Sequence, residues 1–174
     1  ALLLLQGERA RAEAMASQAR AMALEHGQGR NAALALRVLG QATLAGGSRE
    51  EIEKAEGLFL DAVTETRRLG LADQEPQPLV GAAQARLAAG QRDGALALAQ
   101  EAEEIAEARG LRQAQAEASV VLGELALAEG KVDLATEKAL AARELALCDG
   151  PPYCLKRPLD AADALLAKIG AGRG

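Results

Sequence analysis

Residues 90–110 read GQRDGALALAQEAEEIAEARG, and this stretch decides the fold class. It is rich in Ala, Leu, Glu and Gln, which favour helix over strand. Its small residues at helical spacing are Ala95, Ala99, Ala102 and Ala106. Spacings of four, three and four residues place them on one face of a helix. A glycine stands at each end of the stretch, where it supplies a left-handed backbone conformation at little cost. The stretch therefore predicts one helix of about 16–19 residues between two tight turns.

Glycines recur along the whole chain at nearly this spacing. They are Gly7, Gly27, Gly47, Gly70, Gly90, Gly110, Gly130, Gly150 and Gly170. Neighbouring members are 20 residues apart, except Gly47 and Gly70, which are 23 apart. We expect each of these glycines to lie just past a helix end. Two helices then make a repeat of about 40 residues, and such internal periods are typical of solenoids.

A set of small residues repeats together with the glycines. Stripes with the helical spacing i, i+4, i+7 and i+11 occur at Ala12, Ala16, Ala19 and Ala23; at Ala55, Phe59, Ala62 and Thr66; at Ala95, Ala99, Ala102 and Ala106; and at Ala135, Ala139, Ala142 and Ala146. We assign each stripe to the second helix of a hairpin, the B helix, and expect the first helix, the A helix, to pack closely on it. Ser48 and Glu51 have the spacing of a capping box that opens a B helix. Asp93 and Asp133 are expected at the N-caps of two other B helices.

Composition and charge exclude several classes of protein. The 174 residues include 20 Lys and Arg against 25 Asp and Glu, a net charge of −5, with one Phe, one Tyr and no Trp. Few residues are β-branched, which excludes an all-β domain. An acidic chain with both signs interspersed has no general attraction for nucleic acid or an anionic membrane. No apolar run reaches the roughly 20 residues that span a bilayer, and two cysteines give no disulfide framework. A cytoplasmic location is therefore expected.

The residues that could carry chemistry do not assemble into a recognisable centre. Residues 27–32, GQGRNA, fit a dinucleotide fingerprint, but that motif requires a preceding strand and a helix is expected here. His26, the one histidine, stands at a helix end, where the helix dipole favours a cationic ring. Cys148 and Cys154 lack the spacing of a zinc site; we expect two thiols, with a disulfide across the turn as the alternative. No catalytic residue, cofactor, metal or enzymatic activity is expected.

Two stretches share a pattern in which a Leu-Gly pair is followed seven residues later by a turn glycine and then by a stripe of small residues. The first stretch has Leu36, Leu39, Gly40, Gly47, Ala55, Phe59 and Ala62, and the second has Leu122, Gly123, Gly130, Ala135, Ala139 and Ala142. This pattern resembles the tetratricopeptide repeat. The long period is similar to that of arrays attached to bacterial signalling ATPases, including regulators of the maltose-activator type. The resemblance implies an all-α, right-handed αα-superhelix of about four helical hairpins plus a C-terminal capping helix.

The repeat register also divides the chain. We expect a single helical-repeat domain over residues 1–174, and a fragment of a larger bacterial protein. The expected units are a truncated first repeat (1–27), three repeats (28–70, 71–110 and 111–150), a capping helix (151–170) and a tail (171–174).

In arrays that this chain resembles, the A helices line a concave face that binds the partner. The corresponding groove positions are Arg37, Gln41, Gln77, Gln84, Glu117, Glu124 and Arg157. Related arrays that bind acidic chaperone tails need several Lys, Arg and Asn residues at fixed groove positions. Only Arg37 occupies such a position here, so binding of acidic chaperone tails is not expected. The chain has a single asparagine, Asn31. Peptide-pheromone receptors with similar repeats use several asparagines in their groove, so this class of receptor is not expected.

The resemblance implies a non-enzymatic scaffold for protein–protein interaction or regulation within a signalling protein. Its partner is expected to be a protein, a peptide or another domain of the same chain, with no nucleic acid and no membrane. The alternative is a small-molecule (inducer) sensing domain of a transcription regulator. Such a domain would need an apolar pocket with a few convergent polar groups.

Overall fold

The protein folds into helices joined by short turns. The computed structural model describes residues 2–148, 150 and 153–172, with side chains from Gly7 onward, and this part of the chain holds eight helices and no strand. The helices are α1 (Leu2–Glu25), α2 (Gly29–Leu44), α3 (Arg49–Arg68), α4 (Pro76–Ala88), α5 (Arg92–Ala108), α6 (Arg112–Ala128), α7 (Val132–Leu147) and α8 (Lys156–Ala171). The all-α fold class is confirmed.

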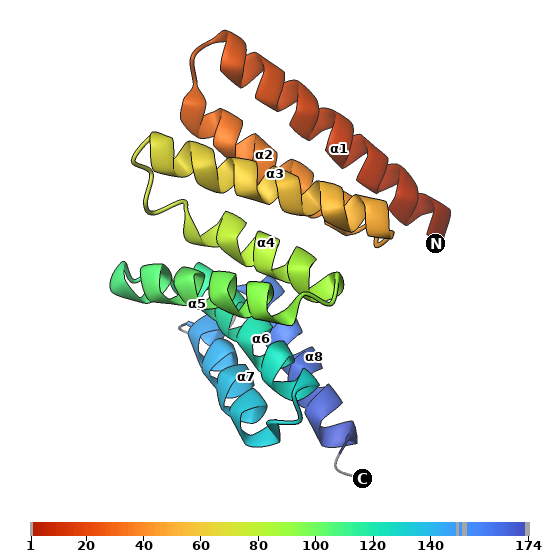
Figure 1. Ribbon diagram of the computed structural model, residues 1–174, viewed down its shortest axis with the longest axis vertical. Helices are drawn as coiled ribbons and strands as arrows, with labels where there is room; N and C mark the ends of the chain where they lie inside the picture. The colour runs from red at the N-terminus through yellow and green to blue at the C-terminus, as the bar shows by residue number, and fades with distance from the viewer. Residues whose placement is uncertain (1, 149, 151–152, 173–174) are drawn as a thin grey trace.

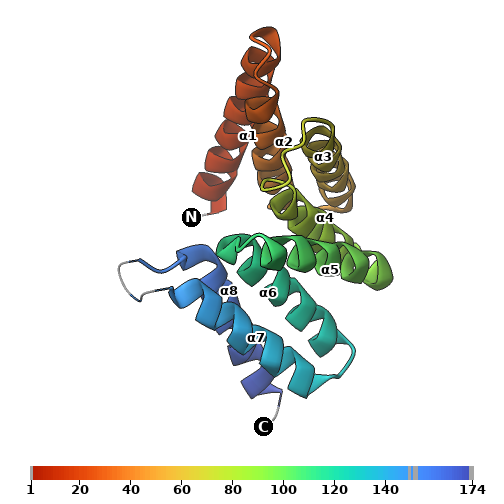
Figure 2. The ribbon, with the colours of Figure 1, turned by 90° about the vertical axis from the view of Figure 1, so that its left-hand side faces the viewer.

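Each helix packs against the next one in the chain, and the even-numbered helices also touch one another in sequence. The A helices are α2, α4, α6 and α8, and the B helices are α1, α3, α5 and α7. Three complete hairpins, α2–α3, α4–α5 and α6–α7, thus lie between α1 and α8 (Figure 1). Figure 2 shows the helix direction turning along the stack, so that the solenoid is twisted rather than flat.

The turn glycines behave as predicted in the interior of the chain. Seven have positive φ, between +66° and +84°: Gly27, Gly47, Gly70, Gly90, Gly110, Gly130 and Gly150. The prediction was wrong for Gly7 and Gly170, which lie inside α1 and α8. One glycine costs a helix only about 1 kcal/mol, so the helix formers around it carry α1 and α8 through these positions.

The small stripes of α3, α5 and α7 form the core. Their alanines are fully buried, and Phe59 of the α3 stripe is fully buried too. In α1 the same stripe is only half covered: Ala16 and Ala23 are buried, whereas Ala12 is half-buried and Ala19 exposed. The difference arises because α3, α5 and α7 each lie between two A helices, whereas α1 packs on α2 alone among the described helices.

Helix starts were predicted in part. Ser48 forms the expected capping box, since its hydroxyl accepts from the Glu51 amide and the Glu51 carboxylate accepts from the Ser48 amide. Asp93 and Asp133 are not N-caps, because α5 and α7 begin one residue before them. They lie in the first turn instead, where an acidic side chain complements the helix dipole.

The last helix covers the C-terminal end of the stack. It begins at Lys156, with Pro158 in its first turn, where a missing amide donor is harmless. Its buried face consists of Pro158, Ala162, Leu165 and Ile169, and α8 packs on α6 and α7. The predicted tail begins inside the helix, at Ala171, and its residues 173–174 lie outside the described residues.

Candidate binding groove

The even-numbered helices carry the predicted groove positions, and the twist of the stack brings four of these together. Arg37 and Gln41 belong to α2, Glu117 to α6 and Arg157 to α8. With its amide oxygen turned toward the guanidinium groups, Gln41 accepts hydrogen bonds from Arg37 (3.1 Å) and Arg157 (2.9 Å). Gln41 therefore links the first A helix to the last one across the groove.

Arg37 lies in the middle of this cluster. Burial lowers the pKa of Arg37, the negative charge of Glu117 acts in the opposite direction, and the positive charge of Arg157 lowers it again. The neighbours of Arg37 thus include one carboxylate and one further guanidinium group. The local charge is positive in a chain whose net charge is negative.

Glu117 differs from its prediction as an exposed groove residue. Its residue surface is only 8% exposed, and its carboxylate accepts a hydrogen bond from the side chain of Gln113 at 3.2 Å. Neighbouring A helices pack together along α6, which buries both flanks of that helix. Glu117 therefore forms part of the floor of the groove.

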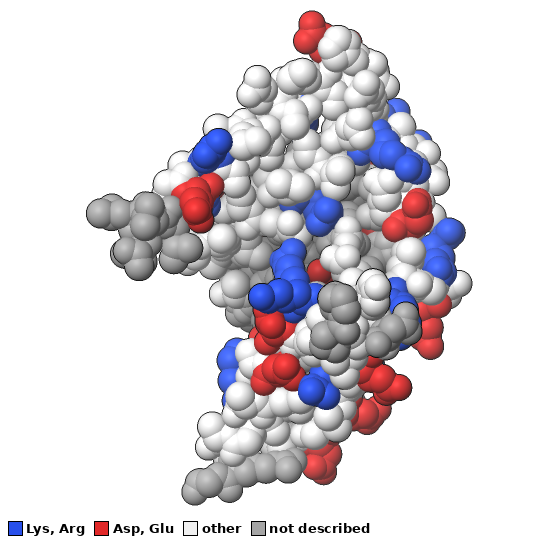
Figure 3. Space-filling model, turned by 180° about the vertical axis from the view of Figure 1, so that it is seen from behind, with Lys and Arg blue, Asp and Glu red and all other residues white. Residues whose placement is uncertain are grey.

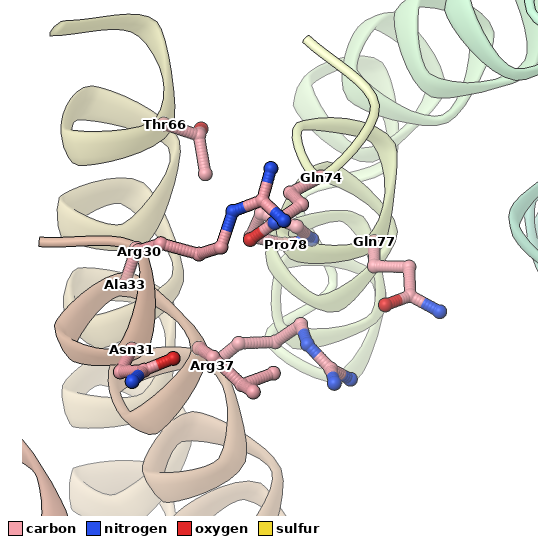
Figure 4. Close-up of a pocket in the computed structure, with 9 residues that line it drawn as sticks. Arg30, Asn31, Ala33, Arg37, Thr66, Gln74, Gln77 and Pro78 are labelled. Atoms are coloured by element: carbon pink, nitrogen blue, oxygen red, sulfur yellow. The ribbon is translucent and has the colours of Figure 1, made fainter. Parts of the chain in front are cut away.

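A pocket of about 330 Å³ opens beside this cluster, between α2 and α4. Its polar lining residues are Arg30, Asn31, Arg37, Thr66, Gln74 and Gln77, completed by Ala33, Leu34 and Pro78. Figure 4 shows Arg30 and Arg37 reaching from α2 toward Gln74 and Gln77. No carboxylate lines this pocket among the described residues. It presents guanidinium and amide groups to whatever enters.

Sequence reasoning missed Arg30 and Gln74. Arg30 lies seven residues before Arg37, so helical spacing could have placed both on one face of α2. Gln74 lies in the loop before α4, and no periodicity of the sequence predicts the path of that loop.

Within the described chain, Arg30, Arg37 and Arg157 make no ion pair with a carboxylate.

The remaining predicted positions lie apart from the arginine cluster. Gln77 reaches the pocket, but Gln84 is half-buried further along α4 and does not line it. Glu124 of α6 lies 3.6 Å from the ammonium group of Lys168 in α8. On the side of the molecule opposite to that seen in Figure 1, basic side chains gather near the middle of the surface and acidic side chains lie below them (Figure 3).

Other candidate chemistry gains no support from the geometry. Cys148 and Cys154 are free thiols, so the alternative of a disulfide across the turn was wrong. In the described part of the chain, no group of three His, Cys, Asp or Glu side chains could hold a metal ion. No described helix is long and apolar enough to cross a membrane.

Comparison with known proteins supports the fold. No protein-family model and no curated protein matches the sequence. Among solved structures, the chain is similar to the crystal structure of BtubC (BKLC) from P. vanneervenii, with a TM-score of 0.71, 19% sequence identity and 97% of this chain covered. The match covers 66% of that protein's chain, just under two thirds. The fold is therefore that of a tetratricopeptide-like helical repeat.

Proposed function

We propose that this chain is a non-enzymatic scaffold that binds an acidic protein segment in the groove lined by its A helices. The observation that carries the proposal is the set of three arginines, Arg30, Arg37 and Arg157, that face this groove without an ion-pair partner among the described residues. A guanidinium group binds a carboxylate through two parallel hydrogen bonds, which gives both affinity and orientation.

The surroundings of the arginines suit a peptide. Asn31, Gln74 and Gln77 each offer an amide donor and an amide acceptor, which can pair with a peptide backbone. Arg37 is partly desolvated before any ligand arrives, and a carboxylate beside it would compensate that loss. An extended concave surface is also what stacked repeats provide for binding. The acidic segment belongs to another protein or to another domain of the same polypeptide, in a bacterial signalling protein.

A binding measurement tests this proposal directly. The probe is a fluorescein-labelled peptide pool rich in Asp and Glu, followed by fluorescence anisotropy. Because charged hydrogen bonds contribute about 1.5–3 kcal/mol each, Arg30→Ala plus Arg37→Ala should weaken binding at least about tenfold. The same pool with Gln and Asn in place of the acids should bind much more weakly to the wild-type protein.

A matched control separates the groove from general electrostatics. Lys54→Ala removes one positive charge from the exposed side of α3 and should leave binding nearly unchanged. Circular dichroism should report the same helix content for all variants. Equal weakening by Lys54→Ala, or equal binding of the neutral peptide pool, would show that the groove is not the site.

A small anionic ligand is the second candidate, as in an inducer-sensing domain. The pocket volume of about 330 Å³ lies within the range of small-molecule sites. Thermal-shift measurements with dicarboxylates and phosphate esters distinguish the two functions. A small anion that raises Tm through Arg30 and Arg37, while the peptide pool does not bind, would favour the sensor.

A further inference from the structure

Long polar side chains alone make the contact between α2 and α8 across the groove. The two helices do not pack against each other, and Gln41 of α2 accepts hydrogen bonds from Arg157 of α8 (2.9 Å) and from Arg37 of its own helix (3.1 Å). Two guanidinium groups therefore lie within hydrogen-bond distance of one uncharged oxygen atom. The positive charge of Arg157 lowers the pKa of Arg37, which is the sign expected for two like charges held close together.

Arginines at other helix contacts of this protein end on a carboxylate instead. Three of them reach across to another helix in this way: Arg9 to Glu51 (2.8 Å), Arg86 to Glu56 (2.7 Å) and Arg143 to Asp163 (2.8 Å). Arg37 and Arg157 have no carboxylate within ion-pair distance in the part of the chain that the structure describes. An amide oxygen carries no net charge and does not compensate two cations. The space between these two arginines therefore suits an anionic group of a ligand.

The charge of this region indicates which anionic group fits best. Arg30, Arg37 and Arg157 face the groove, and Glu117 on its floor is the one acidic neighbour that acts on Arg37. A carboxylate brings one negative charge, whereas a phosphate monoester brings about −1.5 to −2 at neutral pH and three acceptor oxygens. These oxygens point in different directions, so guanidinium groups from two facing helices can donate to one phosphate at the same time.

We propose that a phosphorylated Ser or Thr side chain of the acidic segment binds between Arg37 and Arg157, with its phosphate in the place of the Gln41 oxygen. This inference rests on the proposed function of the groove. Gln41 adapts to the phosphate, because a half-turn of its amide replaces the acceptor with N–H donors. The neighbouring residues of the segment lie in the adjoining pocket, which offers Arg30 and three side-chain amides.

A comparison of three peptide pools tests the inference by fluorescence anisotropy. The fluorescein-labelled acidic pool is made with phosphoserine, serine or glutamate at one fixed central position. Because two guanidinium groups form charged hydrogen bonds with the phosphate, the phosphoserine pool should bind at least about tenfold more tightly than either of the others. Equal affinities of the phosphoserine and glutamate pools would overturn the inference.

Substitutions in the first turn of α8 locate the phosphate. Arg157→Ala should weaken binding of the phosphoserine pool about tenfold and of the serine pool less than about threefold. Arg157→Lys keeps the charge but loses the planar pair of donors, so it should restore only part of the affinity. Lys156→Ala is the matched control, because it removes one positive charge from the adjacent exposed position. Equal weakening by Lys156→Ala and Arg157→Ala would overturn the inference.

Glu117 gives a test of opposite sign. Its carboxylate lies on the floor of the groove, buried and hydrogen-bonded by Gln113 at 3.2 Å, and its negative charge opposes an anion beside Arg37. Glu117→Gln should therefore tighten binding of the phosphoserine pool about threefold. Glu124→Gln, which removes the same charge seven residues further along α6, should change the affinity little. Circular dichroism should report unchanged helix content, and weaker binding by Glu117→Gln would overturn the inference.

Failure of this inference can be told apart from failure of the proposed function. If the serine pool binds through Arg30 and Arg37 but phosphorylation adds nothing, the groove binds acidic segments and only the phosphate site is overturned. If none of the three pools binds, both are overturned. Free phosphoserine that competes as well as the phosphoserine pool would assign the site to a small phosphate ester and overturn the assignment to a protein segment.

Discussion

Gly81 of α4 lies directly against the ring of Phe59 in α3, and the ring fits there because Gly81 has no side chain. A Cβ at position 81 would lie 2.7 Å from ring atom Cζ, closer than any carbon contact in a packed core. Gly40 of α2 approaches the same ring, and a Cβ there would lie 2.9 Å from Cε1. One aromatic side chain thus fills the junction of three helices, and two glycines make the room for it.

Gly81→Ala should destabilise the protein although alanine is the better helix former. Phe59 is fully buried and cannot yield, so the added methyl group overpacks the junction by about 1–3 kcal/mol. Gly57→Ala is the control, because nothing lies within 4 Å of a Cβ there. It should raise the free energy of unfolding by up to about 1 kcal/mol. Urea unfolding of both variants measures the difference, and equal effects would contradict the tight contact.

The alanine stripe of α5 gives a second prediction. Ala102 is fully buried between helices, whereas Ala108, near the end of α5, is exposed. Ala102→Leu should lower the free energy of unfolding by about 1–3 kcal/mol, since the neighbouring backbones leave no room for the larger side chain. Ala108→Leu should change it by less than about 0.5 kcal/mol. Thermal unfolding followed by circular dichroism compares them, and a tolerated leucine at position 102 would refute close packing there.

Glu103 holds three helices together. Its carboxylate lies 2.8 Å from the ammonium group of Lys138 in α7 and accepts a hydrogen bond from the Ser119 hydroxyl of α6 at 2.7 Å. Glu103→Ala leaves both groups without this acceptor and should cost about 1–3 kcal/mol. Glu107→Ala, at an exposed position of the same helix, should have almost no effect on urea unfolding. If the two variants unfold alike, the bridge contributes nothing.

The capping box makes stability depend on pH. Hydrogen bonds from Ser48 hold the pKa of Glu51 below its ordinary value near 4.5, helped by Arg9. A depressed carboxyl pKa stabilises the fold above the ordinary pKa, and this contribution disappears as the pH falls through the folded-state pKa. The Tm difference between wild type and Ser48→Ala should therefore be larger at about pH 7 than at about pH 3. Calorimetry at both pH values checks this, with Ser17→Ala, an exposed serine within α1, as the pH-independent control.

The fold was predictable because its signals are local. A left-handed turn needs glycine at one position, and a close contact between two helices needs small residues at four positions of one helix face. Gly110 and the stripe ending at Ala106 can therefore be interpreted without knowledge of the rest of the chain. Helix ends were harder to predict, because Asp93 suits both an N-cap and a first turn. The competing starts differ by so little free energy that spacing alone cannot choose between them.

The groove was predictable only as a set of positions. The helical register identified Arg37 and Gln41 as one face of α2, but the twist between repeats decides which residues of distant helices meet. That twist brings Arg157 to Gln41 and buries Glu117, although these residues are far apart in sequence. Glu103 illustrates the same limit: its side chain contacts Ser119 of α6 and Lys138 of α7, and the register of α5 alone does not predict these partners.

The hydrogen bonds of Gln41 to Arg37 and Arg157 also bear on how this protein unfolds. In repeat arrays whose units contact only their neighbouring units, the terminal units can unfold one at a time. Here the last helix is tied to a side chain of the second one. We therefore expect that fraying at one terminus weakens a contact made near the other, and that the array unfolds more cooperatively than one without this contact.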